Sequence, residues 1–97
     1  MQRTELVLGN VRGEILLFSD DQKAGKMDIS VIGKKLTVYH TEVNFEHEGR
    51  GFAKILLERL VSYARENDLK IVPLCPYVLL QFKRHPDEYN DVWLKED

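Results

Sequence analysis

The first half of the chain alternates apolar and polar residues in short runs. Between residues 27 and 32 every second position is apolar, and a similar alternation follows, with Leu36, Val38 and His40 expected on one face. A period of two is typical of strands with one buried face. Short polar or glycine-containing segments separate the runs, which predicts an antiparallel meander. The predicted strands are 5–8, 12–19, 27–32 and 36–43, with residues 20–26 as a polar turn.

The pattern changes in the middle of the chain, where apolar residues recur at intervals of three and four. This spacing predicts an amphipathic helix over residues 52–67. A short apolar run at 69–74 predicts another strand, and two helices are predicted at 77–84 and about 87–94, with Trp93 packing into the core. Because a helix connects the fifth strand to the fourth, these two strands are expected to be parallel. The order β-β-β-β-α-β-α-α predicts an α+β domain with one mixed sheet.

Length and charge place the chain among small globular proteins. It has 97 residues, of which 43% are hydrophobic and 31% charged, so a single domain over residues 1–97 is expected. Lys+Arg of 14 against Asp+Glu of 16 leaves no basic excess for binding nucleic acid. No membrane-spanning apolar run and no signal peptide are expected. The single cysteine, Cys75, excludes an internal disulfide and a cysteine-based zinc site, so a reducing, cytoplasmic location is expected.

The strongest chemical signal lies where the fourth strand gives way to the long helix. Residues 48–53 read EGRGFA, a glycine-bearing loop that opens directly into the helix. Such a loop turns backbone N–H groups toward one point, where the helix N-terminus favours a bound anion. Arg50 and Lys54 add positive charge, so a pyrophosphate fits this segment. Alternatively, Gly49 and Gly51 serve only a tight turn. The glycine patterns of Walker loops and dinucleotide folds are absent.

This junction resembles the acetyl-CoA-binding motif of the GNAT acetyltransferases, Arg/Gln-x-x-Gly-x-Gly/Ala. Gly51 and Ala53 stand at its last two fixed positions, whereas Glu48 replaces the Arg or Gln. A wider resemblance, to a subfamily of very small GNAT-like proteins, covers most of residues 27–93. The segments that carry this wider resemblance are HTEV at 40–43, EGRGFA at 48–53, PLCPYV at 73–78 and RHP at 84–86.

The resemblance implies a GNAT-like mixed sheet of about five strands, with a parallel pair, 36–43 and 69–74, that splays apart. Acetyl-CoA is then the donor substrate, its pantetheine arm hydrogen-bonded to the main chain of the first of these strands, and the acceptor is an unknown amine. Pro73 lacks an N–H and either helps the strands to separate or simply ends an edge strand. The residues expected against the cofactor are Thr41, Val43, Glu48, Gly49, Arg50, Gly51, Phe52, Ala53, Lys54, Cys75, Tyr77, Phe82 and Arg84.

Two features depart from the family pattern. Only residues 9–11 separate the first two strands, where most members have helices that help to hold the acceptor, so the N-terminal region is reduced. The tyrosine that usually protonates the departing thiolate falls near Phe82, which has no hydroxyl, and Tyr77 is an alternative at a different spacing.

By the resemblance, Cys75 lies where the acetyl group arrives, and its thiolate could accept that group and pass it on. His40 is the candidate base, since imidazole titrates near neutral pH, and Glu42 is an alternative. Each residue also has a structural interpretation: Cys75 as an inert buried thiol, His40 as a hydrogen-bonded strand residue and Glu42 as an exposed carboxylate. Arg84 belongs to a basic cluster at residues 83–85. This cluster either contacts the cofactor's phosphates or an acidic acceptor, or only reflects the usual excess of positive charge at a helix C-terminus.

These residues are compatible with three functions. An N-acetyltransferase is favoured, with a non-catalytic module that binds or senses acetyl-CoA as the alternative, and a cofactor-free interaction domain as the third. A monomer or weak dimer is expected, and His47 is expected to be a solvated loop residue.

Overall fold

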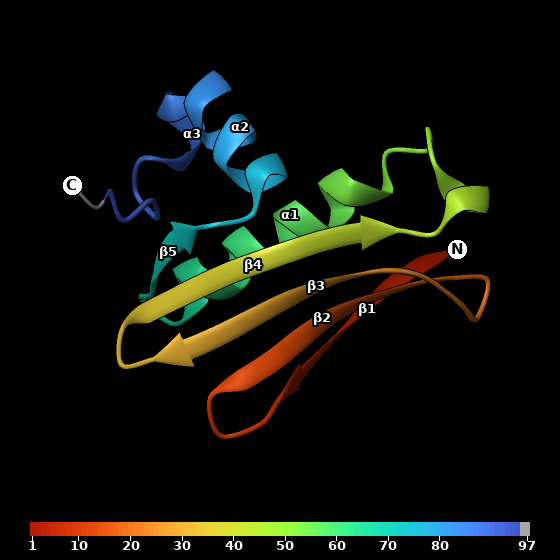
Figure 1. Ribbon diagram of the computed structural model, residues 1–97, viewed down its shortest axis with the longest axis horizontal. Helices are drawn as coiled ribbons and strands as arrows, with labels where there is room; N and C mark the ends of the chain where they lie inside the picture. Colours follow the sequence, from red (N-terminus) through yellow and green to blue (C-terminus); the bar gives the residue numbers. More distant parts are fainter. Residues whose placement is uncertain (96–97) are drawn as a thin grey trace.

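Five strands form one mixed sheet in the order in which they follow along the chain (Figure 1). The computed structural model describes residues 1–95. Strands β1 to β4 pair antiparallel, and β4 pairs parallel with β5, which confirms the predicted α+β class, element order and parallel pair. The elements are β1 (Gln2–Leu8), β2 (Arg12–Ser19), β3 (Gln22–Ile32), β4 (Lys35–Val43), the 3₁₀ turn Phe45–His47, α1 (Phe52–Glu66), β5 (Lys70–Pro73), α2 (Pro76–Arg84) and α3 (Pro86–Tyr89).

The third strand begins five residues earlier than its alternation predicts. Asp20 and Asp21 have φ angles of 51° and 68°, so these two residues alone turn the chain between β2 and β3. A two-residue turn with both central residues left-handed matches the twist of a hairpin, and aspartate tolerates that conformation. Residues 22–26 were therefore wrongly predicted as a turn, and Ala24 is buried in the core.

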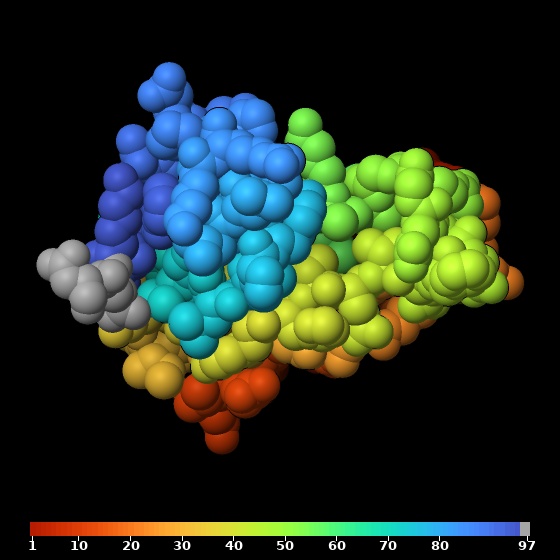
Figure 2. Space-filling view, turned by 45° about the horizontal axis from the view of Figure 1, so that its top comes forward, coloured from red at the N-terminus to blue at the C-terminus, as the bar shows by residue number. Residues whose placement is uncertain are grey.

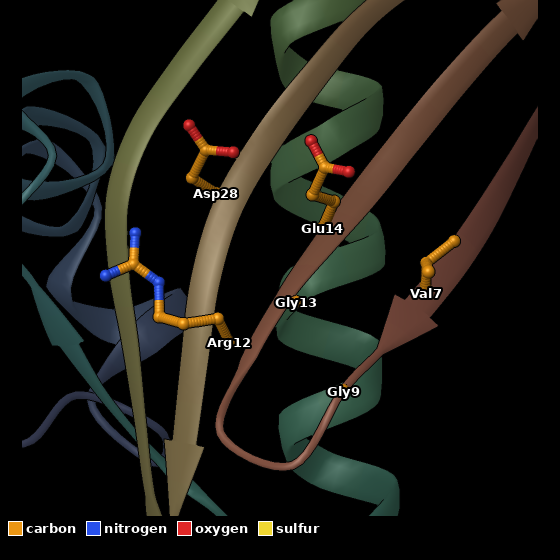
Figure 3. Close-up of a pocket in the computed structure, with 6 residues that line it drawn as sticks. All are labelled: Val7, Gly9, Arg12, Gly13, Glu14 and Asp28. Atoms are coloured by element: carbon orange, nitrogen blue, oxygen red, sulfur yellow. The ribbon is translucent and has the colours of Figure 1, made fainter.

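Helix α1 covers one face of the sheet. Its buried stripe includes Leu56, Leu57 and Leu60, which are at most 1% exposed and pack with buried side chains of β2, β3 and β4. Burial of side chains of this size stabilises the fold by about 1.5–3 kcal/mol each. In Figure 3 the strands lie in front of α1, and the face toward the viewer carries the charged side chains of Arg12, Glu14 and Asp28. Within residues 1–95, no helix is long and apolar enough to cross a bilayer.

A β-bulge interrupts β4 at Tyr39. Asp28 pairs with His40, but Ile29 pairs with Val38, so Tyr39 is an extra residue on β4. A bulge of one residue reverses which side chains face the core beyond it. The prediction that His40 shares the face of Val38 was therefore wrong, because Val38 is fully buried and the His40 side chain is 59% exposed.

The last predicted helix ends early. Helix α3 stops at Tyr89, and the chain then lies along the outer edge of β5, where Ile71 N–H donates to Val92 O (2.6 Å) and Leu94 N–H donates to Ile71 O (2.8 Å). The helix predicted over 87–94 was wrong beyond Tyr89, because these contacts with a distant strand replace helical hydrogen bonds. The Trp93 ring is half-buried, 5.7 Å from that of Phe82.

Candidate functional site

The site lies where β4 and β5 part. Their ladder covers four residue pairs, from Lys35 with Lys70 to Val38 with Pro73. One further hydrogen bond, from Cys75 N–H to Val38 O (3.0 Å), closes the pairing. Beyond it β4 continues to Val43, while the chain after β5 turns into α2. Over residues 39–43, β4 has no strand partner on this side within the described chain.

The bulge also turns main-chain groups of β4 toward this open edge. Val38 O points to the β5 side, since it accepts from Cys75, whereas Asn44 N–H donates to Ala24 O of β3 (2.7 Å). Alternate residues of a strand direct their N–H and C=O groups to opposite edges. Thr41 and Val43 therefore direct theirs away from β3, to the edge that β5 leaves uncovered.

The N-terminus of α1 follows β4 after the short 3₁₀ turn. Gly49 and Gly51 have φ angles of 82° and 77°, and Gly51 is the N-cap residue of α1, with no side-chain capping hydrogen bond. The first N–H groups of a helix have no partners inside it. A Cβ added at either glycine would meet no atom within 4 Å, so the loop is open. This geometry suits an anion, because N–H groups and the helix dipole point to one place.

Arg50 is held by two aromatic neighbours. Its guanidinium Nη1 lies 3.0 Å from Nδ1 of His47 and its Cζ lies 5.0 Å from the ring centre of Phe52, on which His47 stacks at 5.5 Å. His47 is only 9% exposed, so the expectation of a solvated loop residue was wrong. Because a guanidinium can only donate, Nδ1 is the acceptor in this contact. Lys54, on the first turn of α1, is exposed.

Cys75 and Thr41 meet at the point of separation. The Cys75 sulfur lies 3.2 Å from the Thr41 hydroxyl, and Cys75 is 2% exposed at the N-cap of α2. Tyr77, in the first turn of α2, is half-buried. Burial, and then electrostatic interaction with Cys75 and Glu58, raises the pKa of Tyr77, so its hydroxyl keeps its proton. Figure 2 shows β4 in yellow at the surface between α2 in cyan and the loop before α1 in green.

The predicted bases lie elsewhere. His40 and Glu42 stand on the opposite face of β4 from Thr41, with His40 Nε2 3.8 Å from Glu42 Oε1. On that face, Lys26 Nζ also contacts Glu42 (3.8 Å) and Asp28 (3.3 Å). A shallow depression of about 310 Å³ adjoins it, lined by Asp28 and residues of β1, β2 and their connecting turn (Figure 3). The structure therefore does not bring either predicted base to Cys75.

Two predicted cofactor residues are also placed away from this edge. Phe82 is fully buried and stacks on Tyr89 with a centroid separation of 5.0 Å, so its ring has no surface for a ligand. Arg84 is exposed in the last turn of α2, and Figure 1 shows this end of α2 beside α3, away from the N-terminus of α1. The other predicted residues lie along β4, in the loop before α1, in the first turn of α1, or near the start of α2.

Fold and site together define an α+β protein in which an open strand edge is followed by a glycine loop and a helix N-terminus whose geometry suits an anion. The profile of the family described as GCN5-related N-acetyl-transferase matches residues 14–92. The chain belongs to this family, the GNAT acetyltransferases.

Several solved structures share the fold. A GCN5-like protein from Staphylococcus aureus is 28% identical, with a TM-score of 0.66 over 96% of this chain and 90% of that chain. The ribosomal-protein-alanine N-acetyltransferase of Brucella melitensis is 21% identical, with a TM-score of 0.67 over 92% of this chain and 66% of that chain. The ribosomal-protein-S18-alanine N-acetyltransferase of Escherichia coli is 16% identical, with a TM-score of 0.64 over 68% of this chain.

This chain spans 43% of the length of the Escherichia coli enzyme and 66% of the length of the Brucella melitensis enzyme. Among curated proteins, none matches the sequence significantly.

Proposed function

We propose that this chain is an N-acetyltransferase that takes the acetyl group from acetyl-CoA and transfers it to an amine. One observation carries the proposal: the open edge of β4 begins beside the thiol of Cys75 and leads to the loop before the uncapped N-terminus of α1. Membership of the GNAT family supports it.

The chemistry of acetyl-CoA matches each part of the site. The pantetheine amides can pair with the main chain of Thr41 and Val43, as a short strand adds to a sheet edge. The pyrophosphate can accept hydrogen bonds from the N–H groups that follow Gly51. Arg50 and Lys54 bring positive charge to the same loop and first turn.

Cys75 and Tyr77 supply the chemistry at the thioester. In a two-step route, the Cys75 thiolate attacks the carbonyl carbon, the bond to the CoA sulfur breaks, and the departing thiolate takes the Tyr77 proton. The amine then displaces Cys75 and returns a proton to Tyr77. In a direct route, the amine attacks the carbonyl carbon of acetyl-CoA, the bond to the CoA sulfur breaks, the departing thiolate takes the Tyr77 proton and the amine returns one to Tyr77, while Cys75 only lines the site.

Titration with acetyl-CoA and a turnover assay with a panel of amines test the proposal. Acetyl-CoA should raise the melting temperature, since a ligand selective for the folded state stabilises it. Arg50→Ala and Lys54→Ala should each weaken binding, more at low salt than at high salt. Lys34→Ala, in the exposed turn between β3 and β4, is the matched control and should leave affinity unchanged. A wild-type protein that does not bind acetyl-CoA would overturn the proposal.

A non-catalytic module that binds or senses acetyl-CoA is the second candidate. The burial of Phe82 and the position of His40 and Glu42 on the far face favour it, because the site then has neither the usual tyrosine nor the predicted base. Binding of acetyl-CoA without release of CoA in the presence of any amine would select this candidate. We also infer a cytoplasmic location, which the free thiol of Cys75 supports.

A further inference from the structure

A groove of about 320 Å³ runs between the end of β5, α2 and the segment after α3. Its lining is mainly apolar and includes Pro73, Leu74, Leu79 and Trp93. The Leu74 side chain is large and apolar, yet the residue is 59% exposed. A concave apolar surface of this volume lies at the lower end of the range for ligand pockets.

Lysines supply the charge of the groove. Lys83 of α2 and Lys95 both line it, and Lys95 Nζ lies 4.7 Å from the ring centre of Trp93. Within residues 1–95, no aspartate or glutamate lines the groove. An apolar partner that carries carboxylates is complementary to this arrangement, whereas a basic partner is repelled.

One end of the groove is formed by Leu74, the residue before Cys75. Consecutive Cα atoms are about 3.8 Å apart. The main chain at this end lacks a donor. Ile71 directs its N–H and C=O to the outer edge of β5, so Pro73, two residues on, directs its C=O to the same edge and has no N–H. A carboxylate therefore finds no main-chain donor at Pro73 and is better placed at the lysine end of the groove.

We propose that this groove binds the acceptor, and that the acceptor is a short acidic peptide with a free amino terminus. The amine lies toward Leu74, apolar side chains lie on Trp93 and Leu79, and a carboxylate lies between Lys83 and Lys95. The role as acceptor rests on the proposed acetyl transfer, whereas the preference for an acidic apolar peptide rests on the groove alone.

Fluorescence of Trp93, the only tryptophan in the chain, reports occupancy of the groove without any turnover. The probes are two pentapeptides with free amino termini, alanine-leucine-glutamate-leucine-glutamate and the same peptide with lysines in place of the glutamates. The wild type should bind the acidic peptide about five- to tenfold more tightly, as expected of two exposed ion pairs, and high salt should reduce the difference. Lys83→Glu leaves one negative and one positive side chain in the groove and should abolish the preference, while Lys34→Glu, on an exposed turn away from the groove, should keep it.

Equal responses to the two peptides, or a preference that Lys83→Glu does not change, would overturn the proposal. So would a Trp93 signal that depends on protein concentration without peptide, because the groove would then join two copies of the chain. Acetyl-CoA affinity, measured on the same variants, separates this result from a failure of the proposed function. Lys83→Glu should leave that affinity unchanged, and a wild type that binds the acidic peptide but not acetyl-CoA would contradict only the proposed function.

Discussion

The hydroxyl oxygen of Thr41 lies 3.2 Å from the sulfur of Cys75, across the point where β4 and β5 part. This contact joins residues 34 positions apart in the sequence and places a buried thiol beside the open main-chain edge of β4. The thiol is therefore next to the edge on which we place the pantetheine arm.

The first prediction concerns acetyl transfer to Cys75. Incubation with acetyl-CoA should add one acetyl group, seen by intact mass, that hydroxylamine removes and that Cys75→Ala abolishes. Thr41→Val keeps the main chain and shape but removes the hydroxyl, so it should slow this acetylation and leave acetyl-CoA affinity unchanged. If Cys75→Ala acetylates an amine at the wild-type rate, direct transfer is the mechanism and Cys75 is a packing residue.

The second prediction concerns the loop before α1. Gly51→Asp places a negative charge at the helix N-terminus and should weaken acetyl-CoA binding at least about tenfold, or about 1.4 kcal/mol. Gly33→Asp is the matched control, because Gly33 also has a positive φ, of 59°, and also has no atom within 4 Å of its Cβ position. Both variants bear similar backbone strain, but only Gly51→Asp should lose affinity in titration. Equal affinities in the two folded variants would contradict the phosphate site.

The third prediction concerns Tyr77 as a proton donor. Tyr77→Phe should lower kcat about a hundredfold while KM for acetyl-CoA changes little, since general acid catalysis contributes on this scale. Burial raises the pKa of Tyr77 above its ordinary value of about 10. Tyr77 therefore keeps its proton below about pH 10, and wild-type kcat should not decrease in that range because of Tyr77 ionisation. Tyr63→Phe is the control, because Tyr63 is also a half-buried tyrosine but lies on α1. An unchanged kcat in Tyr77→Phe would assign the proton to another group.

The fourth prediction concerns the bulge in β4. The Tyr39 hydroxyl lies 2.7 Å from the hydroxyl of Ser30, which is 2% exposed, and the Tyr39 ring lies under the Arg12 guanidinium at 4.4 Å. Tyr39→Phe leaves a buried hydroxyl without its partner and should lower the free energy of unfolding by about 1–3 kcal/mol in urea denaturation. Adding Ser30→Ala should recover part of this loss, because both partners are then removed. A further loss in the double variant would contradict this explanation.

The fifth prediction concerns stability at low pH. Arg65 donates to both carboxylate oxygens of Asp91, at 2.8 and 3.1 Å, and this hydrogen bonding holds the pKa of Asp91 below its ordinary value. A lowered folded-state pKa stabilises the protein above the unfolded pKa of about 3.9, and the stabilisation is lost as pH falls through the folded value. Because the pair is exposed, Asp91→Asn should cost no more than about 1 kcal/mol at pH 7 and less at pH 2.

Chemical denaturation at pH 7 and at pH 2 measures this difference. Asp87→Asn, an exposed aspartate in α3, is the control and should cost less at pH 7. A cost for Asp91→Asn that is the same at both pH values would show that the ion pair does not contribute.

The glycine loop and the helix that follows it could be predicted, because their signals are local. Two glycines before an apolar stripe of period 3.6 indicate a helix N-terminus, and both glycines do adopt positive φ angles. The anchoring of Arg50 by His47 had no such signal. It depends on the 3₁₀ turn at Phe45–His47, which stacks the imidazole of His47 on the ring of Phe52.

The sequence by itself determined the class of fold, the order of its elements and the parallel pair, because hydrophobic period and crossover geometry act over short segments. Only the tertiary structure decided which residues of β4 face the site. Tyr39 is an extra residue on β4, which shifts the register with β3, and cross-strand contacts such as Tyr39 with Ser30 form at this bulge. The shift sends His40 to the far face and leaves Thr41 beside Cys75, a pairing that no spacing along the chain encodes.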